Sequence, residues 1–203
     1  MRLDHVSYVT SHDQLADTVQ RLGSRLGSTF VDGGIHPRFG TRNFTASLKN
    51  GQYIEVVCPI DHPATDQTNF GLAVKQKALS GGGWFAWVIR TPNIEEIEKR
   101  LERKAIAGDR IKPDGSNLKW KQLGVKELSK NGHFPFFVQW LSENHPSKDL
   151  EAKTSIRPLL LQMSFLQSLF LVNLPRDKLE LEEQQMNPKV TLVYQLQMRP
   201  FQS

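Results

Sequence analysis

The sequence predicts an α+β fold made of two similar halves, each a strand, a helix and three further strands. Two observations support this: hydrophobic patterns follow the same order in both halves, and two turn sequences recur at a nearly constant offset. Recurrence of this kind is typical of a duplicated structural unit. The recurring turns are Lys49-Asn50-Gly51 with His62-Pro63, and Lys130-Asn131-Gly132 with His145-Pro146.

We therefore predict a domain over residues 1–152, built from tandem βαβββ units at about 1–68 and 81–152. A small C-terminal α/β extension is predicted over 153–203. The two units are expected to form a cupped mixed sheet. A seam between two fused units is a favourable place for a pocket.

Each element of the first half has a local signal. β-Branched and alternating residues favour the strands. Leu15, Val19 and Leu22 share one face of a helix because they are spaced by three or four residues. Asn50-Gly51 is a strong hairpin signal, and Asp32-Gly33-Gly34 is predicted to be a turn. The predicted elements are a strand over 3–10, a helix over 13–26, and strands over 28–31, 43–48 and 53–57.

The second half repeats this order after a predicted helix over 69–79 and a glycine-rich break. Pro92 and Asn93 are helix start signals, and Asn131-Gly132 is predicted to join the last two strands. The segment 107–113 is too short to assign. The predicted elements are a strand over 84–90, a helix over 93–104, and strands over 118–123 and 136–141.

Composition narrows the class of protein. Of the 203 residues, 38% are hydrophobic and 23% are charged, as in an ordinary soluble protein. The net charge is +5, but Lys and Arg are scattered, so we predict no nucleic-acid partner. Cys58 is the single cysteine, which excludes an intramolecular disulfide and favours a small buried hydrophobe. The sequence begins directly in a strand pattern, so we predict no signal peptide and a cytoplasmic location.

Residues 159–174 form an uncharged, leucine-rich run. A membrane-spanning helix needs about 20 mostly apolar residues, and this run is shorter and carries several polar side chains. We therefore predict a buried helix rather than a membrane segment. A contact helix in a homodimer is a second interpretation that remains open.

His5 and Glu55 are the first candidates for chemistry, because each lies within an apolar predicted strand. Burying a carboxylate is costly unless it is paired, protonated or bound to a metal. Imidazole and carboxylate are both good ligands for divalent metals. Two interpretations remain open: a metal site, or side chains satisfied by ordinary hydrogen bonds.

Three segments of the first half carry a family resemblance: 33–37 (Gly-Gly-Ile-His-Pro), 40–43 (Gly-Thr-Arg-Asn) and 53–55 (Tyr-Ile-Glu). Together with the duplicated pattern over residues 3–150, they resemble the glyoxalase-like branch of the vicinal oxygen chelate superfamily. The resemblance implies a divalent metal held by a His and a Glu from each unit. Such a metal chelates adjacent substrate oxygens and stabilises an enolate or related anion.

The second half departs from this pattern. The strand that corresponds to His5 lies within 84–87, where no residue can bind a metal. The strand that corresponds to Glu55 lies within 136–140, where only Gln139, a weak ligand, could coordinate. The resemblance therefore implies an incomplete metal site of His5 and Glu55, and argues against a standard glyoxalase I.

The predicted pocket combines polar groups of the first half with aromatic residues of the second. Glu55 and His36 are the predicted catalytic residues, while the predicted substrate-binding residues are Arg42, Asn43, Trp84, Trp87 and Gln139. The ligand is predicted to be a small molecule. Three functions remain open: a lyase, isomerase or ring-opening dioxygenase-type enzyme; a non-catalytic binder that sequesters an aromatic or toxic compound; and a dimerisation module.

Overall fold

The structure is a computed structural model, and it describes residues 1–128 and 135–151. The first half contains β1 (Arg2–Val9), α1 (Leu15–Leu26), β2 (Val31–His36), β3 (Thr41–Leu48) and β4 (Gln52–Pro59). Two helices, α2 (Pro63–Gln67) and α3 (Asn69–Leu79), connect the halves. The second half contains β5 (Gly83–Arg90), α4 (Ile94–Leu101), β6 (Ile106–Ile111), β7 (Asn117–Leu123), α5 (Val125–Leu128) and β8 (Phe136–Trp140).

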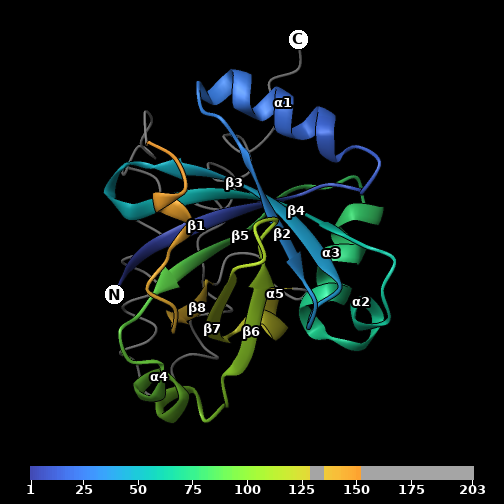
Figure 1. Ribbon diagram of the computed structural model, residues 1–203. Helices are drawn as coiled ribbons and strands as arrows, with labels where there is room; N and C mark the ends of the chain where they lie inside the picture. Colours follow the sequence, from blue (N-terminus) through green and yellow to red (C-terminus); the bar gives the residue numbers. More distant parts are fainter. Residues whose placement is uncertain (129–134, 152–203) are drawn as a thin grey trace, which may run out of the picture. The chain divides into compact units, whose positions relative to one another are not determined.

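The eight strands of the described residues close into a barrel in the order β1-β4-β3-β2-β6-β7-β8-β5 (Figure 1). Within each half the first and last strands are parallel, β1 with β4 and β5 with β8. The halves meet antiparallel at β1 and β5 along most of both strands, and at β2 and β6 through the pair Ile35–Ile111. The predicted tandem βαβββ fold is confirmed, with a sheet that closes instead of remaining an open cup.

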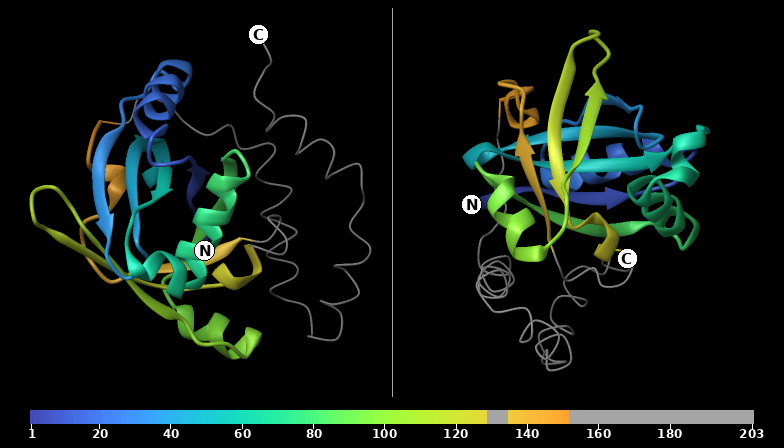
Figure 2. Two further views of the ribbon diagram at one scale, coloured as in Figure 1. Left: turned by 90° about the vertical axis from the view of Figure 1, so that its right-hand side faces the viewer. Right: turned by 90° about the horizontal axis from the view of Figure 1, so that it is seen from below.

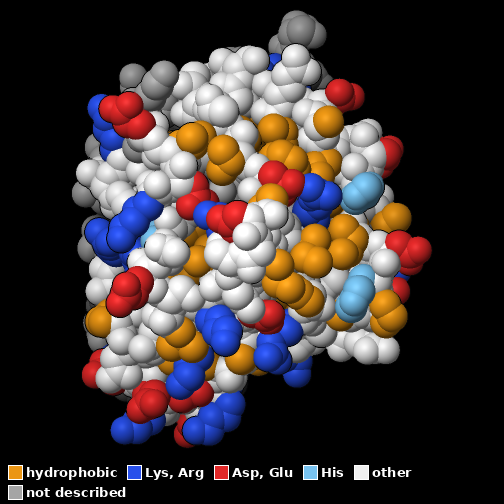
Figure 3. Space-filling model, viewed as in Figure 1, with side chains coloured by type: hydrophobic (Ala, Val, Ile, Leu, Met, Phe, Trp, Pro, Cys, Tyr) orange, Lys and Arg blue, Asp and Glu red, His pale blue; other side chains and the backbone are white. Residues whose placement is uncertain are grey.

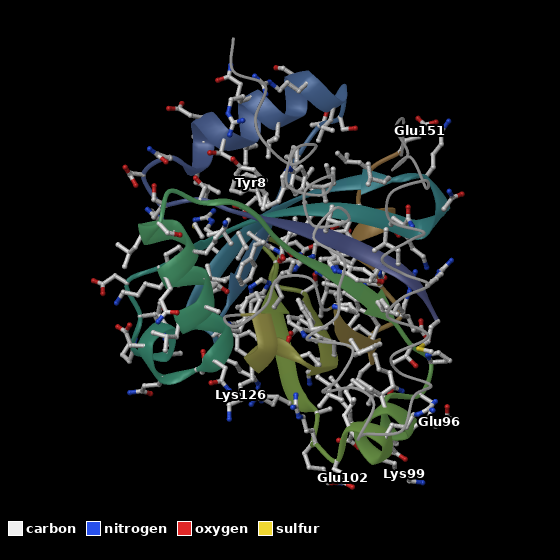
Figure 4. All side chains as sticks on the ribbon, turned by 180° about the vertical axis from the view of Figure 1, so that it is seen from behind. Tyr8, Glu96, Lys99, Glu102, Lys126 and Glu151 are labelled. Carbon is white, nitrogen blue, oxygen red and sulfur yellow. The ribbon has the colours of Figure 1, made fainter. Side chains whose placement is uncertain are left out.

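Helices cover the outside of this barrel. Figures 1 and 2 show α1 outside the strands of the first half and α4 at the opposite end. The apolar face predicted for α1 places Leu15 and Leu22 against Val56 and Cys58 of β4. Tyr8, labelled in Figure 4, lies between α1 and the strands. The side chains on the other face of each strand therefore point into the barrel.

Local signals explain where several elements begin and end. The Asn50-Gly51 hairpin is confirmed, and both residues have left-handed φ angles of 64° and 66°. Asn93 caps α4 by accepting a hydrogen bond from the Glu95 amide, as predicted. This helix ends at Leu101, earlier than predicted, because Glu102 takes the left-handed conformation that ends a helix.

The prediction for the Gly33-Gly34 segment is wrong. These residues lie inside β2, where a register shift against β3 marks a bulge between Asp32 and Gly34. A Cβ on Gly34 would lie 1.8 Å from the carbonyl oxygen of Ile111, so β2 approaches β6 closely at this point. Glycine here permits a strand contact rather than a turn.

The predicted turn at Asn131-Gly132, the extension over 153–203 and the apolar run 159–174 lie outside the described residues. Within the described part, no helix is both long and apolar enough to span a membrane. On the face shown in Figure 3, Lys and Arg side chains are spread among acidic and apolar ones.

Candidate functional site

A small cavity of about 30 Å³ lies inside the barrel. This space admits only water-sized groups, so a larger ligand enters only when side chains of the cavity wall move aside. The first half supplies most of its polar groups and the second half most of its aromatic ones. The lining residues are His5, His36, Asn43, Tyr53, Glu55, Phe70, Arg110, Trp120, Gln122, Phe136, Val138 and Trp140.

Glu55 is a buried carboxylate whose two oxygens both accept hydrogen bonds. Ser7 Oγ donates to Oε2 at 2.6 Å, and Asn43 Nδ2 donates to Oε1 at 2.7 Å. Burial raises the pKa of Glu55, but the nearby imidazoles and these two hydrogen bonds outweigh it, so the net pKa is lowered. Glu55 therefore stays ionised inside the barrel.

His5 lies beside Glu55 and is oriented by its neighbour Asp4. A bulge in β1 between Leu3 and His5 leaves Asp4 as the extra residue. His5 Nδ1 donates to Asp4 Oδ2 at 2.9 Å, and Nε2 lies 3.9 Å from Glu55 Oε2. The ring also stacks on Tyr53, with centroids 4.4 Å apart. The nitrogen nearer Glu55 is thus the one without the Asp4 bond.

Asp4 is completely buried and is held by three residues of the second half as well as by His5. Trp140 Nε1 donates to it at 3.2 Å, His145 Nε2 donates at 3.0 Å, and Arg90 Nε lies at 3.1 Å. Burial opposes ionisation, but the hydrogen bonds from the two histidines hold the pKa of Asp4 well below its usual range. Asp4 is therefore a fixed negative charge behind His5.

His36, the other predicted catalytic residue, also lines the cavity. Its Nδ1 is 2.8 Å from Thr41 Oγ1, and its ring meets Trp120 edge-on at 5.6 Å. Burial lowers the pKa of His36 to about 4, although the charge of Glu55 partly opposes this shift. At neutral pH this imidazole is uncharged.

Arg110 lines the same cavity and was not among the predicted site residues. Its side chain is 2% exposed, and Nη1 donates to Asn43 Oδ1 at 3.4 Å. Among the described residues, Nε and Nη2 have no hydrogen-bond partner. The sequence carries no signal that separates Arg110 from its neighbour Asp109, since both are charged residues between Ile106 and Ile111.

Four predicted substrate-binding residues lie outside this cavity, because neighbouring residues of a strand face opposite ways. Arg42 is on the other face of β3 from Asn43, where it pairs with Asp32. Trp84 packs edge-on against Tyr8, 5.3 Å away. The two remaining residues are Trp87, buried in β5 but absent from the cavity wall, and Gln139, which accepts a hydrogen bond from the Ile94 amide.

The donor set does not fit a resident divalent metal. Across residues 1–128 and 135–151, no three His, Cys, Asp or Glu side chains come together as a possible metal site. Glu55 already accepts two hydrogen bonds, and the cationic Arg110 lines the same cavity. In the described part of β8, Phe136, Val138 and Trp140 face the cavity, and none of them coordinates metals.

Comparison with known proteins agrees with this fold. A family model described as a glyoxalase-like domain matches residues 3–162. The chain belongs to this glyoxalase-like family of the vicinal oxygen chelate superfamily. No curated protein matches the chain.

Solved structures of similar fold are distant in sequence. A hypothetical protein from Staphylococcus aureus is 19% identical with a TM-score of 0.54, and the match covers 70% of this chain and 60% of that one. Methylmalonyl-CoA epimerase from Mycobacterium tuberculosis is 16% identical with a TM-score of 0.45, covering 68% and 86%. A variant of Streptomyces coelicolor methylmalonyl-CoA epimerase in complex with 2-nitronate-propionyl-CoA is 14% identical with a TM-score of 0.45, covering 70% and 99%.

Proposed function

We propose that the cavity catalyses proton transfer on a small molecule with neighbouring oxygens, and that it does so without a resident metal. The observation that carries this proposal is the Asp4–His5 pair facing Glu55 inside a buried cavity. The reaction class is isomerase or lyase chemistry that begins with removal of a proton next to a carbonyl group.

His5 is the proton acceptor in this scheme. If Nδ1 of a neutral His5 donates to Asp4, the lone pair of the ring lies on Nε2, on the side of Glu55. Protonation of Nε2 would place an imidazolium between the carboxylates of Asp4 and Glu55, and both would stabilise it. Glu55 is a weak base because its pKa is lowered, so we assign it the role of a fixed counter-charge.

Negative charge that develops on the substrate would be balanced by Arg110. This guanidinium lines the same cavity, and in a site of low polarity a charged donor stabilises an anion more strongly than it does in water. His36 is neutral and therefore adds no competing charge. The arrangement thus provides a base and an electrostatic partner.

Solvent deuterium exchange tests this proposal. Pyruvate and hydroxyacetone are incubated with the protein in deuterated buffer, and loss of the carbon-bound proton signal is followed by NMR. We expect exchange above the uncatalysed rate, and a drop of about 100-fold in His5→Gln, since a positioned base contributes roughly that factor. His12→Gln, which removes an exposed imidazole, is the matched control. Equal rates in folded His5→Gln and the parent would contradict the proposal.

A second candidate is a non-catalytic binder, which the aromatic wall of the cavity favours. Phe70, Trp120, Phe136 and Trp140 all line it. Binding sites are typically apolar with a few polar groups, and this composition suits a flat ligand. Saturable quenching of tryptophan fluorescence by phenol, without deuterium exchange in any tested carbonyl compound, would support this second function over the first.

A further inference from the structure

We propose that Arg110 is a carboxylate-recognition site and that the natural ligands of the cavity are small carboxylates, with 2-oxo acids as the substrate class. This inference deepens the proposed function and rests on it for the assumption that the cavity is the reaction site. The inference is argued from the geometry of the Arg110 guanidinium and its surroundings.

The fold makes room for this side chain at a specific point. Arg110 lies on β6, and its guanidinium lies against Gly33 of β2. A Cβ on Gly33 would lie 2.9 Å from Arg110 Nη1 and 2.1 Å from Asn43 Oδ1. Glycine at this position therefore lets the guanidinium and the Asn43 amide pack together against the cavity.

The nitrogens of Arg110 that lack partners are the ones a carboxylate would use. Nη1 is directed at Asn43, while Nε and Nη2 are buried without a hydrogen-bond partner among the described residues. These two nitrogens share one edge of the planar group and present two parallel N–H donors. A carboxylate accepts such a pair of donors in a bidentate manner.

Among the described residues, Asp149 forms an ion pair with this edge but no hydrogen bond to it. Asp149 Oδ2 lies 3.9 Å from Nη2, beyond hydrogen-bond range, and the other oxygen of Asp149 is bound by Lys112 at 2.9 Å. The two carboxylate oxygens of Glu55 already accept hydrogen bonds from Ser7 and Asn43. A buried guanidinium with unsatisfied donors is strongly unfavourable. An acceptor from outside the described residues would satisfy these donors, and a ligand carboxylate and a water molecule are the two occupants to be distinguished.

Binding measurements on the full chain separate these two occupants. Thermal unfolding is followed with sodium acetate, sodium pyruvate, acetamide and inorganic phosphate, with sodium chloride holding ionic strength constant. We expect acetate and pyruvate to raise the melting temperature saturably, and acetamide to have no effect. If acetate, acetamide and chloride behave alike, or if phosphate binds more tightly than acetate, the proposal is overturned.

Two variants localise the effect. Arg110→Lys keeps the charge but loses the planar pair of donors, so acetate should bind about tenfold more weakly. Arg42→Lys is the matched control, because Arg42 pairs with Asp32 away from the cavity, and it should bind acetate like the parent. Unchanged acetate affinity in folded Arg110→Lys overturns the proposal. If that variant does not fold, the comparison of acetate with acetamide on the parent protein still decides.

Deuterium exchange distinguishes failure of this inference from failure of the proposed function. Carboxylate binding that depends on Arg110, without exchange in pyruvate, contradicts the proposed function and retains the carboxylate site. Exchange that is equally fast in pyruvate and neutral hydroxyacetone, and unchanged in Arg110→Lys, retains the proposed function and overturns the carboxylate site.

Discussion

The protein should lose less stability as the pH falls when His36 is replaced by Asn. His36 is buried, and burial lowers its pKa from 6.5 to about 4. The unfolded chain therefore binds a proton between these two values while the folded protein does not. This contribution to stability is complete above pH 6.5 and is lost progressively as the pH falls toward 4. Asn can keep a hydrogen bond to Thr41 where Nδ1 now lies.

The size of the effect follows from the two pKa values. Between pH 7 and pH 5, the linkage relation gives a loss of about 2 kcal/mol in the free energy of unfolding from His36 alone. His145 shifts in the same direction, because burial also lowers its pKa. The informative quantity is therefore the difference between the parent and His36→Asn. Glu55 and Asp4 have lowered pKa values and lose their contributions below this window.

Urea unfolding at pH 7 and pH 5 measures this difference. We expect the parent to lose about 2 kcal/mol more than His36→Asn between the two pH values. His12→Asn, which removes an exposed imidazole, should behave like the parent. Equal losses in the parent and in His36→Asn would refute the claim that burial keeps this imidazole neutral.

Three further outcomes are expected. Gly33→Ala should destabilise the fold by about 1–3 kcal/mol in urea unfolding, because its Cβ would meet Asn43 Oδ1 at 2.1 Å; an additive effect in the Asn43→Ala background would contradict this cause. Burial raises the pKa of the Cys58 thiol to about 11, so a thiol reagent should label it only after unfolding; rapid labelling of the native protein would be inconsistent with it. Asp4→Asn should lower the free energy of unfolding by about 3–5 kcal/mol, because its cationic and imidazole partners would no longer face a buried negative charge. A thermal stability equal to the parent's would rule this out.

Much of the fold could be predicted because its signals are local. The two His-Pro sequences recur for a physical reason: His62 and His145 each cap a short helix by accepting a backbone N–H through Nδ1. The Asn50-Gly51 hairpin depends on two left-handed residues and is equally local. Gly33-Gly34 was misassigned because its role depends on β6, a strand that is distant in sequence.

The site was predictable in part. His5, His36, Asn43 and Glu55 come from four strands, and the structure places all of them on one cavity. Arg42 and Asn43 are adjacent in one strand, so only one of them can face inward, and the sequence does not say which. Arg110 could not be identified because the strand that carries it has little hydrophobic alternation. Its partners lie on β3 and near residue 149.

The two halves of the barrel contribute different kinds of side chain to one cavity. The first half supplies His5 and Glu55, whereas β8 faces the same cavity with apolar and aromatic residues. Yet Arg90, Trp140 and His145 of the second half surround Asp4, which fixes the orientation of His5. The second half therefore contacts His5 edge-on through Phe136 and also orients it through Asp4. A site arranged in this way requires both halves, because the buried charge of Asp4 is tolerable only where they meet.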